Sequence, residues 1–208
     1  MLSDAERLLA ARADLSRLLA ACYYEPAAEF AEEKVFDAMV ASADDIDAEL
    51  GAAARGLAAA YTADDLQTLL IDYTRLFLAP EGPLAQPYGS VWLGGAQPLM
   101  QDSTLAVMAL YAEAGFEVDD DFRDLPDHIA AELEFLYALL FREAAARRQG
   151  DTGLADSART LRQRLIAEHL GRSTPRFAAA MRAGAQTAFY RALADLTARH
   201  VEREAMLG

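Results

Sequence analysis

Apolar residues recur every three or four positions along most of this 208-residue chain, which is the spacing of helices that bury one face. The pattern is clearest over 124–141, DLPDHIAAELEFLYALLF. Its apolar stripe consists of Ile129, Leu133, Leu136 and Leu140, widened by Phe135 and Leu139. We expect Asp124 to cap this helix and Pro126 to lie in its first turn, where a missing N–H has no intrahelical acceptor. Four polar residues of the first turns are expected at the mouth or rim of the core: Asp127, His128, Glu132 and Glu134.

The same periodicity predicts helices along the rest of the chain. They cover about 3–24, 28–41, 45–61, 62–78, 102–114 and 127–149, then a helix carrying Leu161 to Leu170, and a last stretch to about 204 that bends near Gly184. A break at 171–174, before Pro175, separates the last two. Capping boxes are predicted at Ser3 with Glu6 and at Thr62 with Asp65. No alternating strand pattern occurs, so the sequence predicts a single all-α domain spanning residues 1–208.

One segment, 79–101, interrupts the helical pattern with four prolines, four glycines and the only tryptophan, Trp92. A connection this long inside a compact domain is usually functional or a linker. Its aromatic and apolar residues argue against a disordered linker. We therefore expect an ordered loop folded over the core, with a short helix near Ser90.

The net charge and the number of cysteines argue against several classes of function. Nineteen basic residues against 33 acidic ones give a net charge of −14, which argues against nucleic-acid binding because phosphate contacts need basic patches. A positively charged partner suits this acidic composition, although most acidic proteins carry their negative charge simply because it keeps them soluble. The single cysteine, Cys22, lies in an apolar helical stripe, which indicates a core position and excludes an internal disulfide framework.

The sequence predicts neither a signal peptide nor a membrane-spanning segment. The N-terminal MLSDAERLLAAR places charges among its apolar residues, unlike a signal peptide. No apolar run approaches the ~18 residues of a membrane span. The expected location is the cytoplasm.

Catalytic and metal-binding motifs are missing from the sequence. His128 and Glu132 lie four positions apart and could share a helix face, but one pair does not make a metal site. Neither a Gly-x-Ser-x-Gly elbow nor a Gly-x-Gly-x-x-Gly turn after a strand occurs. We therefore predict no catalytic residue, no metal and no cofactor.

Three stretches, in this order, resemble the TorD/DmsD/NarJ-like family of redox-enzyme maturation chaperones. They are DYTRLFLAPEGPLAQPYGSVWL (72–93), PDHIAAELEFL (126–136), and HLGRSTPRF (169–177) with the following FYRALADLT (189–197). The family motif reads roughly Glu-x-x-x-Glu-Pro-x-Asp-His. Its last two positions match Asp127 and His128, and its acidic positions fall on Asp120 and Asp124. Two departures are Leu125, where the family usually has proline, and Ser173, where many members have tryptophan.

This resemblance implies an all-helical cytoplasmic chaperone that is not an enzyme. Its partner would be the apo form of a molybdopterin-containing oxidoreductase, bound through its twin-arginine leader peptide. The chaperone would assist cofactor insertion and proofread the client before export, as a monomer or homodimer. In the family the Asp-His pair lies in the region implicated in peptide binding. The candidate peptide-binding residues are therefore Tyr88, Ser90, Trp92, Asp124, Asp127 and His128.

Each candidate residue also has a structural interpretation. Asp127 would support a helix N-terminus, His128 would hydrogen-bond a loop carbonyl, and the aromatic residues near Ser90 would hold the long loop against the core. The acidic segment 117–127 beside an apolar helix face nevertheless suits a ligand with two arginines followed by an apolar segment. Two other functions stay open at this point. One is a helical-bundle enzyme using His128 with Asp127 or Glu132, and the other is a structural assembly adaptor for a respiratory subunit.

Overall fold

The computed structural model describes residues 3–63, 65–93, 100–116 and 124–208, and in these ranges the chain is almost entirely helical. The elements are α1 (Asp4–Ala21), α2 (Glu29–Glu32), α3 (Val35–Ile46), α4 (Ala48–Ala63), α5 (Leu66–Tyr73), the π-helix η1 (Thr74–Leu78), α6 (Gly89–Leu93), α7 (Met100–Glu113), α8 (Ile129–Gln149), α9 (Thr152–Leu165), the π-helix η2 (Ile166–Leu170), α10 (Gly171–Gly184) and α11 (Ala188–Leu207). The described residues form no strand, and one isolated bridge pairs Tyr88 with His128. The all-α prediction is confirmed.

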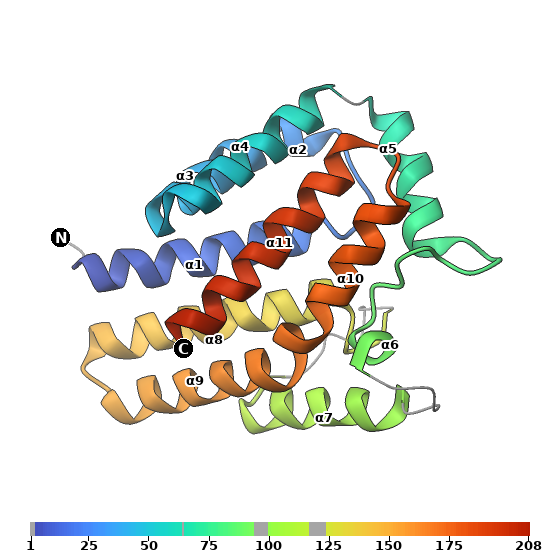
Figure 1. Cartoon of the computed structure of the whole chain (residues 1–208). Coiled ribbons are helices and arrows are strands. Elements are labelled where there is room, and N and C mark those ends of the chain that lie inside the picture. The colour runs from blue at the N-terminus through green and yellow to red at the C-terminus, as the bar shows by residue number, and fades with distance from the viewer. Residues whose placement is uncertain (1–2, 64, 94–99, 117–123) are drawn as a thin grey trace.

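Helix α8 lies between α1 on one side and α9 on the other (Figure 1). The hairpin of α3 and α4 covers α1, and α11 crosses the bundle between α4 and α10 (Figure 1). Leu133 and Leu136 of α8 are fully buried, as their helical spacing predicted. The short helix predicted near Ser90 is α6, which packs on α10 and α7. No helix in the described ranges is long and apolar enough to cross a membrane.

The predicted helix over 28–41 is wrong, because the chain forms two helices there. Lys34 adopts a left-handed conformation, with φ of 54°, between α2 and α3. Such a conformation is costly for a residue with a Cβ. The break lets Phe30 and Phe36 contact each other and the same ring, Tyr61, at centroid distances of 6.5 and 4.5 Å. Packing of three aromatic rings thus offsets a strained backbone position.

Two predicted boundaries are also wrong. Thr62 lies inside α4 and does not cap the next helix, whereas Asp65 alone caps α5 by accepting a hydrogen bond from the Thr68 amide at 2.8 Å. The expected break at 171–174 does not occur, since η2 leads directly into α10 and Pro175 lies within that helix. The fixed φ of proline, about −65°, is itself helical, and its cost is one missing backbone bond. The chain does leave the helix after Gly184, close to the predicted bend.

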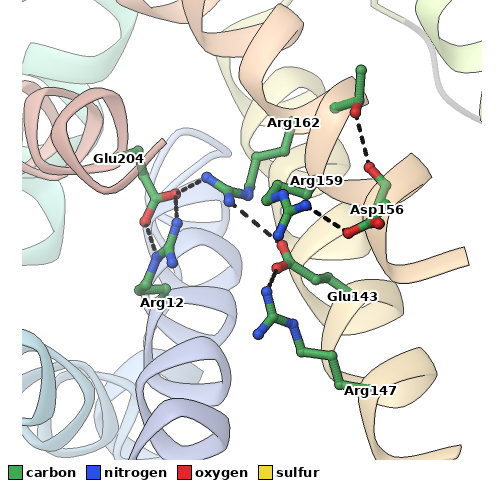
Figure 2. Close-up of polar contacts among 8 residues, drawn as sticks. Arg12, Glu143, Arg147, Asp156, Arg159, Arg162 and Glu204 are labelled. Carbon is green, nitrogen blue, oxygen red and sulfur yellow. Dashed lines mark hydrogen bonds and ion pairs between the residues drawn. The ribbon is translucent and has the colours of Figure 1, made fainter. Parts of the chain in front are cut away.

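A buried network of charges joins four helices, α1, α8, α9 and α11 (Figure 2). Arg12 of α1 forms a bidentate pair with Glu204 of α11, with both N···O distances at 2.7 Å. Arg162 of α9 lies 3.7 Å from Glu204 and 3.5 Å from Glu143 of α8. Although burial raises the pKa of Glu204, the Arg12 hydrogen bonds and the neighbouring positive charges hold it below its ordinary value. This network was not predicted from the sequence.

Candidate functional site

The Tyr88–His128 bridge brings together two segments that the sequence analysis singled out separately. The Gly89 amide donates to the Asp127 carbonyl at 2.8 Å, and the Ile129 amide donates to the Pro87 carbonyl at 2.7 Å. The approach is close, since a Cβ at position 89 would lie 2.9 Å from Oε1 of Glu132 and that side chain would have to shift. The loop before α6 is therefore hydrogen-bonded directly to the start of α8.

The start of α8 differs from the prediction. His128 is the N-cap, and its Nδ1 accepts a hydrogen bond from the Ala130 amide at 3.1 Å. Asp124, predicted to be the cap, is exposed and accepts a hydrogen bond from the Tyr88 hydroxyl at 2.9 Å. Pro126 lies in the turn before the helix, where its carbonyl accepts from the Tyr111 hydroxyl at 2.7 Å. The imidazole nitrogen of His128 thus accepts the capping hydrogen bond that an Asp or Asn oxygen usually accepts.

Three of the four side chains expected at the rim are buried, so that prediction is wrong for them. Asp127, His128 and Glu132 are only 1%, 4% and 1% exposed, because the segment from Pro87 to Leu93 lies over them. Asp127 Oδ2 accepts from the Ser90 amide at 2.9 Å, which holds this segment down. Glu134 is exposed as expected, and its Oε1 accepts from the Tyr24 hydroxyl at 2.9 Å.

His128 lies between two tyrosine rings. Tyr24 stacks on it with 6.4 Å between centroids, and Tyr88 meets it edge-on at 5.5 Å. Burial lowers the pKa of His128, although Asp124 and Asp127 act in the opposite direction. Because Nδ1 accepts from a backbone amide, the neutral ring carries its proton on Nε2.

Trp92 lies at the other end of the same surface and is half-buried. Its Nε1 donates to the Gln86 carbonyl at 2.8 Å, and its ring lies 6.2 Å from that of Phe177 in α10. Its carbonyl accepts from Arg176 at 2.9 Å. Trp92 thus holds the loop in place while leaving part of its indole accessible.

Together these contacts define a surface of two exposed carboxylates and three partly exposed aromatic side chains. The aromatic–acidic surface consists of Tyr24, Tyr88, Trp92, Asp124 and Glu134. Of the predicted site residues, it includes Tyr88, Trp92 and Asp124, whereas Ser90, Asp127 and His128 lie directly beneath it. Four of the acids expected in this region, Glu117, Asp119, Asp120 and Asp121, lie outside the described residues.

A small hollow lies under Tyr88 and Gly89, between α6, α8 and α10. It has a volume of about 10 Å³, close to what a single water-sized group needs. Asp127 and Glu132 line it together with apolar groups that include Trp92 and Phe177. Both carboxylate oxygens of Glu132 and Oδ1 of Asp127 are buried without a hydrogen-bond partner. Burial, and then the charge of Asp127, raise the pKa of Glu132 well above its ordinary value.

Sequence reasoning missed some members of this region. Tyr24 was assigned only to the end of the first helix, and Phe177 was noted only as the last residue of the HLGRSTPRF stretch that carries the family resemblance. Tyr24 stands in the run Tyr23-Tyr24-Glu25-Pro26, where a tyrosine pair at a helix end offered the one available hint.

Among the described residues of this surface, the chemistry available is the acceptance of hydrogen bonds by carboxylates. In the described ranges, no three His, Cys, Asp or Glu residues are grouped so that they could hold a metal ion. Burial raises the pKa of Cys22 to about 12, so this core cysteine is a thiol near neutral pH. His128 and Glu132, the alternative acid–base pair, are covered by the loop. The accessible groups are carboxylates beside aromatic rings.

Comparison with known proteins gives three similarities. The family model described as nitrate reductase delta subunit matches residues 43–179. The chaperone protein TorD of Vibrio parahaemolyticus serotype O3:K6 (strain RIMD 2210633) is 32% identical over 74 residues, which is 36% of this chain and 34% of the relative. The chain therefore matches about a third of that relative's length. A crystal structure of a redox enzyme maturation protein from Archaeoglobus fulgidus is 23% identical with a TM-score of 0.40, covering 75% of this chain and 93% of that one.

Proposed function

The chain belongs to the nitrate reductase delta subunit family, and from this premise we propose that it is a cytoplasmic chaperone for a molybdopterin-containing oxidoreductase. In this proposal its 208 residues act as one binding domain without catalytic activity. The chaperone binds the twin-arginine leader peptide of the apo-enzyme, assists cofactor insertion and proofreads the client before export. The name of the Vibrio relative, a chaperone, supports the general role.

The observation that carries the peptide-binding part is the aromatic–acidic surface. Asp124 and Glu134 are exposed carboxylates, each already hydrogen-bonded to a tyrosine hydroxyl that fixes its position. A guanidinium group offers several N–H donors in a planar fork that matches carboxylate geometry. Each well-placed charged hydrogen bond contributes roughly 1.5–3 kcal/mol. Asp124 and Glu134 each offer such an acceptor to an arginine of the leader.

The apolar part of a leader has a surface to follow on the same side. Val91, Trp92 and Leu93 of α6 are partly exposed, and Leu125 is 43% exposed beside Asp124. An apolar segment directly after two arginines could pack along these side chains. Asp127, Ser90 and His128 then support the surface from below through the contacts that hold the loop and the helix start.

The test uses Trp92, the only tryptophan of the chain, as a fluorescent reporter. A leader peptide with two adjacent arginines and no tryptophan should shift or quench its emission with saturable dependence on concentration. Changing both arginines to glutamine should weaken binding by at least about tenfold, the equivalent of about 1.4 kcal/mol. Rising salt should weaken it too, because exposed charges are screened over about 8–10 Å at physiological ionic strength.

Charge-reversal variants test whether the leader peptide binds at the aromatic–acidic surface. Asp124→Lys should weaken the leader peptide by about tenfold or more, while Glu202→Lys, an exposed acid of α11, serves as the matched control. Equal affinity in both variants would place the peptide elsewhere. If calorimetry shows tight binding while Trp92 emission stays constant, then α6 does not contact the peptide.

A further inference from the structure

The hollow beneath the aromatic–acidic surface holds acceptors that nothing in the described protein satisfies. Glu132 is 1% exposed, and neither of its carboxylate oxygens has a hydrogen-bond partner. Asp127 is equally buried and uses only Oδ2, leaving Oδ1 unpaired. Both side chains line the hollow under Tyr88, Gly89 and Trp92. A buried acceptor without a partner destabilises the folded protein unless a donor reaches it, so these three oxygens indicate a site for a group that carries hydrogen-bond donors.

We infer that Asp127 and Glu132 form a buried acid pair that receives one guanidinium group of the leader peptide and releases a proton as it does so. This inference rests on the proposed function, because it identifies a second acceptor site below the exposed one. The unprotonated pair offers only acceptors, and a guanidinium offers only donors. Recognition of one arginine at the surface and another in the hollow would distinguish a pair of arginines from a single one.

The surroundings favour a proton on Glu132 in the absence of ligand. In the described ranges, four titratable groups face the pair: His128 at the N-cap of α8, Tyr88 from the loop, Tyr111 from α7 and His169 from η2. Burial lowers the pKa of His169 and His128, and burial together with the nearby acids raises the pKa of Tyr111 and Tyr88. Near neutral pH these neighbours add no positive charge. Two buried carboxylates beside each other cannot both ionise at low cost, so Glu132 keeps its proton in the free protein.

Access requires a limited movement. The hollow has room for a water-sized group only, so a guanidinium enters when α6 lifts from the turn before α8. That movement breaks the Ser90 amide bond to Asp127 Oδ2, which adds a fourth acceptor oxygen to the three already unpaired. Gly89 presents no Cβ to the entering group, and the five residues of α6 form only a short helix to displace.

The direction in which pH changes the affinity for the leader peptide follows from the proton released on binding. In the free protein Glu132 holds a proton, because burial and then the charge of Asp127 raise its pKa. In the complex the guanidinium charge lowers the pKa of Glu132, so its proton leaves to the buffer. Binding should therefore strengthen as pH rises between the pKa of the complex and that of the free protein, and level off above the latter. Because the pKa of Glu132 is raised well above its ordinary value, the titration should run from that ordinary range into alkaline pH.

Calorimetry of leader binding in buffers of different ionisation enthalpy tests the inference directly. We expect release of about one proton per wild-type complex, and none from Glu132→Gln, whose affinity should also lose its pH dependence. Glu202→Gln on α11 should release the same proton as the wild type. Unchanged proton release in Glu132→Gln, or no release from the wild type, would overturn the buried acid pair while leaving leader binding intact.

A second measurement needs neither a variant nor a leader, and so separates this inference from the proposed function. The ¹³C resonance of the Glu132 carboxyl group in the free protein should titrate well above an ordinary glutamate. Millimolar methylguanidinium should lower its midpoint. A midpoint that does not move with methylguanidinium would refute the acid pair as a guanidinium site. Failure of every leader peptide to bind, with this shift present, would count against the proposed function instead.

Discussion

Leu133 and Leu136 lie in the middle of α8 with no solvent exposure, whereas Phe141 of the same helix is 54% exposed. A buried leucine contacts many neighbours at once, so its truncation removes both transfer free energy and packing. At this scale the free energy of unfolding depends on which face of α8 a residue occupies. The difference between these positions can be measured.

Leu133→Ala and Leu136→Ala should each lower the free energy of unfolding by about 2–5 kcal/mol, because a cavity remains in the core. Phe141→Ala is the matched control and should lose much less, since about half of its ring is in water in the folded state. Urea unfolding followed by circular dichroism measures all three. Equal losses for Phe141 and the two leucines would contradict the assignment of helix faces.

The position of single side chains was only partly predictable from the sequence. Helical spacing correctly placed Leu133 and Leu136 in the core, and Glu134 on the surface. It failed for Glu132, because the burial of that residue comes from the loop around Gly89, some forty positions earlier in the chain. Periodicity describes one helix and its own faces, and says nothing of a distant segment that covers one of them.

The secondary-structure elements, like the single side chains, were only partly predictable from the sequence. Most helices and the short helix near Ser90 were predicted, whereas the π-helices η1 and η2 were not, since no propensity distinguishes a wide turn from an ordinary one. The π-helix η2 leaves no room for a side chain at position 171. A Cβ at Gly171 would lie 2.5 Å from the Ile166 carbonyl oxygen, far inside van der Waals contact. The residues that the sequence analysis interpreted as a break are thus a tightly packed continuation of the helix.

Gly171→Ala should therefore destabilise the protein by about 1–3 kcal/mol, the usual range for an overpacked site. Gly153→Ala offers a control near the start of α9, where the nearest atom to a new Cβ is 3.6 Å away. Alanine has the higher helix propensity, so this control should be neutral or stabilising by up to about 1 kcal/mol. Thermal unfolding of both variants gives the comparison. A neutral Gly171→Ala would mean that the π-helix relaxes into an α-helix at little cost.

At the scale of the whole molecule, the sequence predicted which segments are helical but not how they pair. The buried charges joining α1, α8, α9 and α11 illustrate why (Figure 2). Arg12 and Glu204 are 192 positions apart, and each by itself resembles a residue on the exposed face of an amphipathic helix. Their side chains are 5% and 0% exposed in the folded protein. Such a contact depends on the packed bundle, which local spacing does not describe.

This network leads to an asymmetric prediction. Glu204→Gln leaves Arg12 and Arg162 buried with the single carboxylate of Glu143 nearby, and unpaired buried charges cost about 3–5 kcal/mol. Arg12→Met should cost less, because Glu204 keeps Arg162 at 3.7 Å as a partner and methionine fills much of the volume. The double variant should be more stable than the sum of the two losses implies, since neither side chain is then left facing an unpaired charge.

Denaturant unfolding of the two single variants, the double variant and the wild type completes this cycle. Glu202→Gln, an exposed neighbour on α11, controls for the loss of one negative charge from a protein that carries −14. The order of stability should be wild type and control first, then Arg12→Met, then Glu204→Gln. Additive losses in the double variant would show that Arg12 and Glu204 stabilise the bundle independently. The bidentate contact would then contribute nothing beyond the packing of the two side chains.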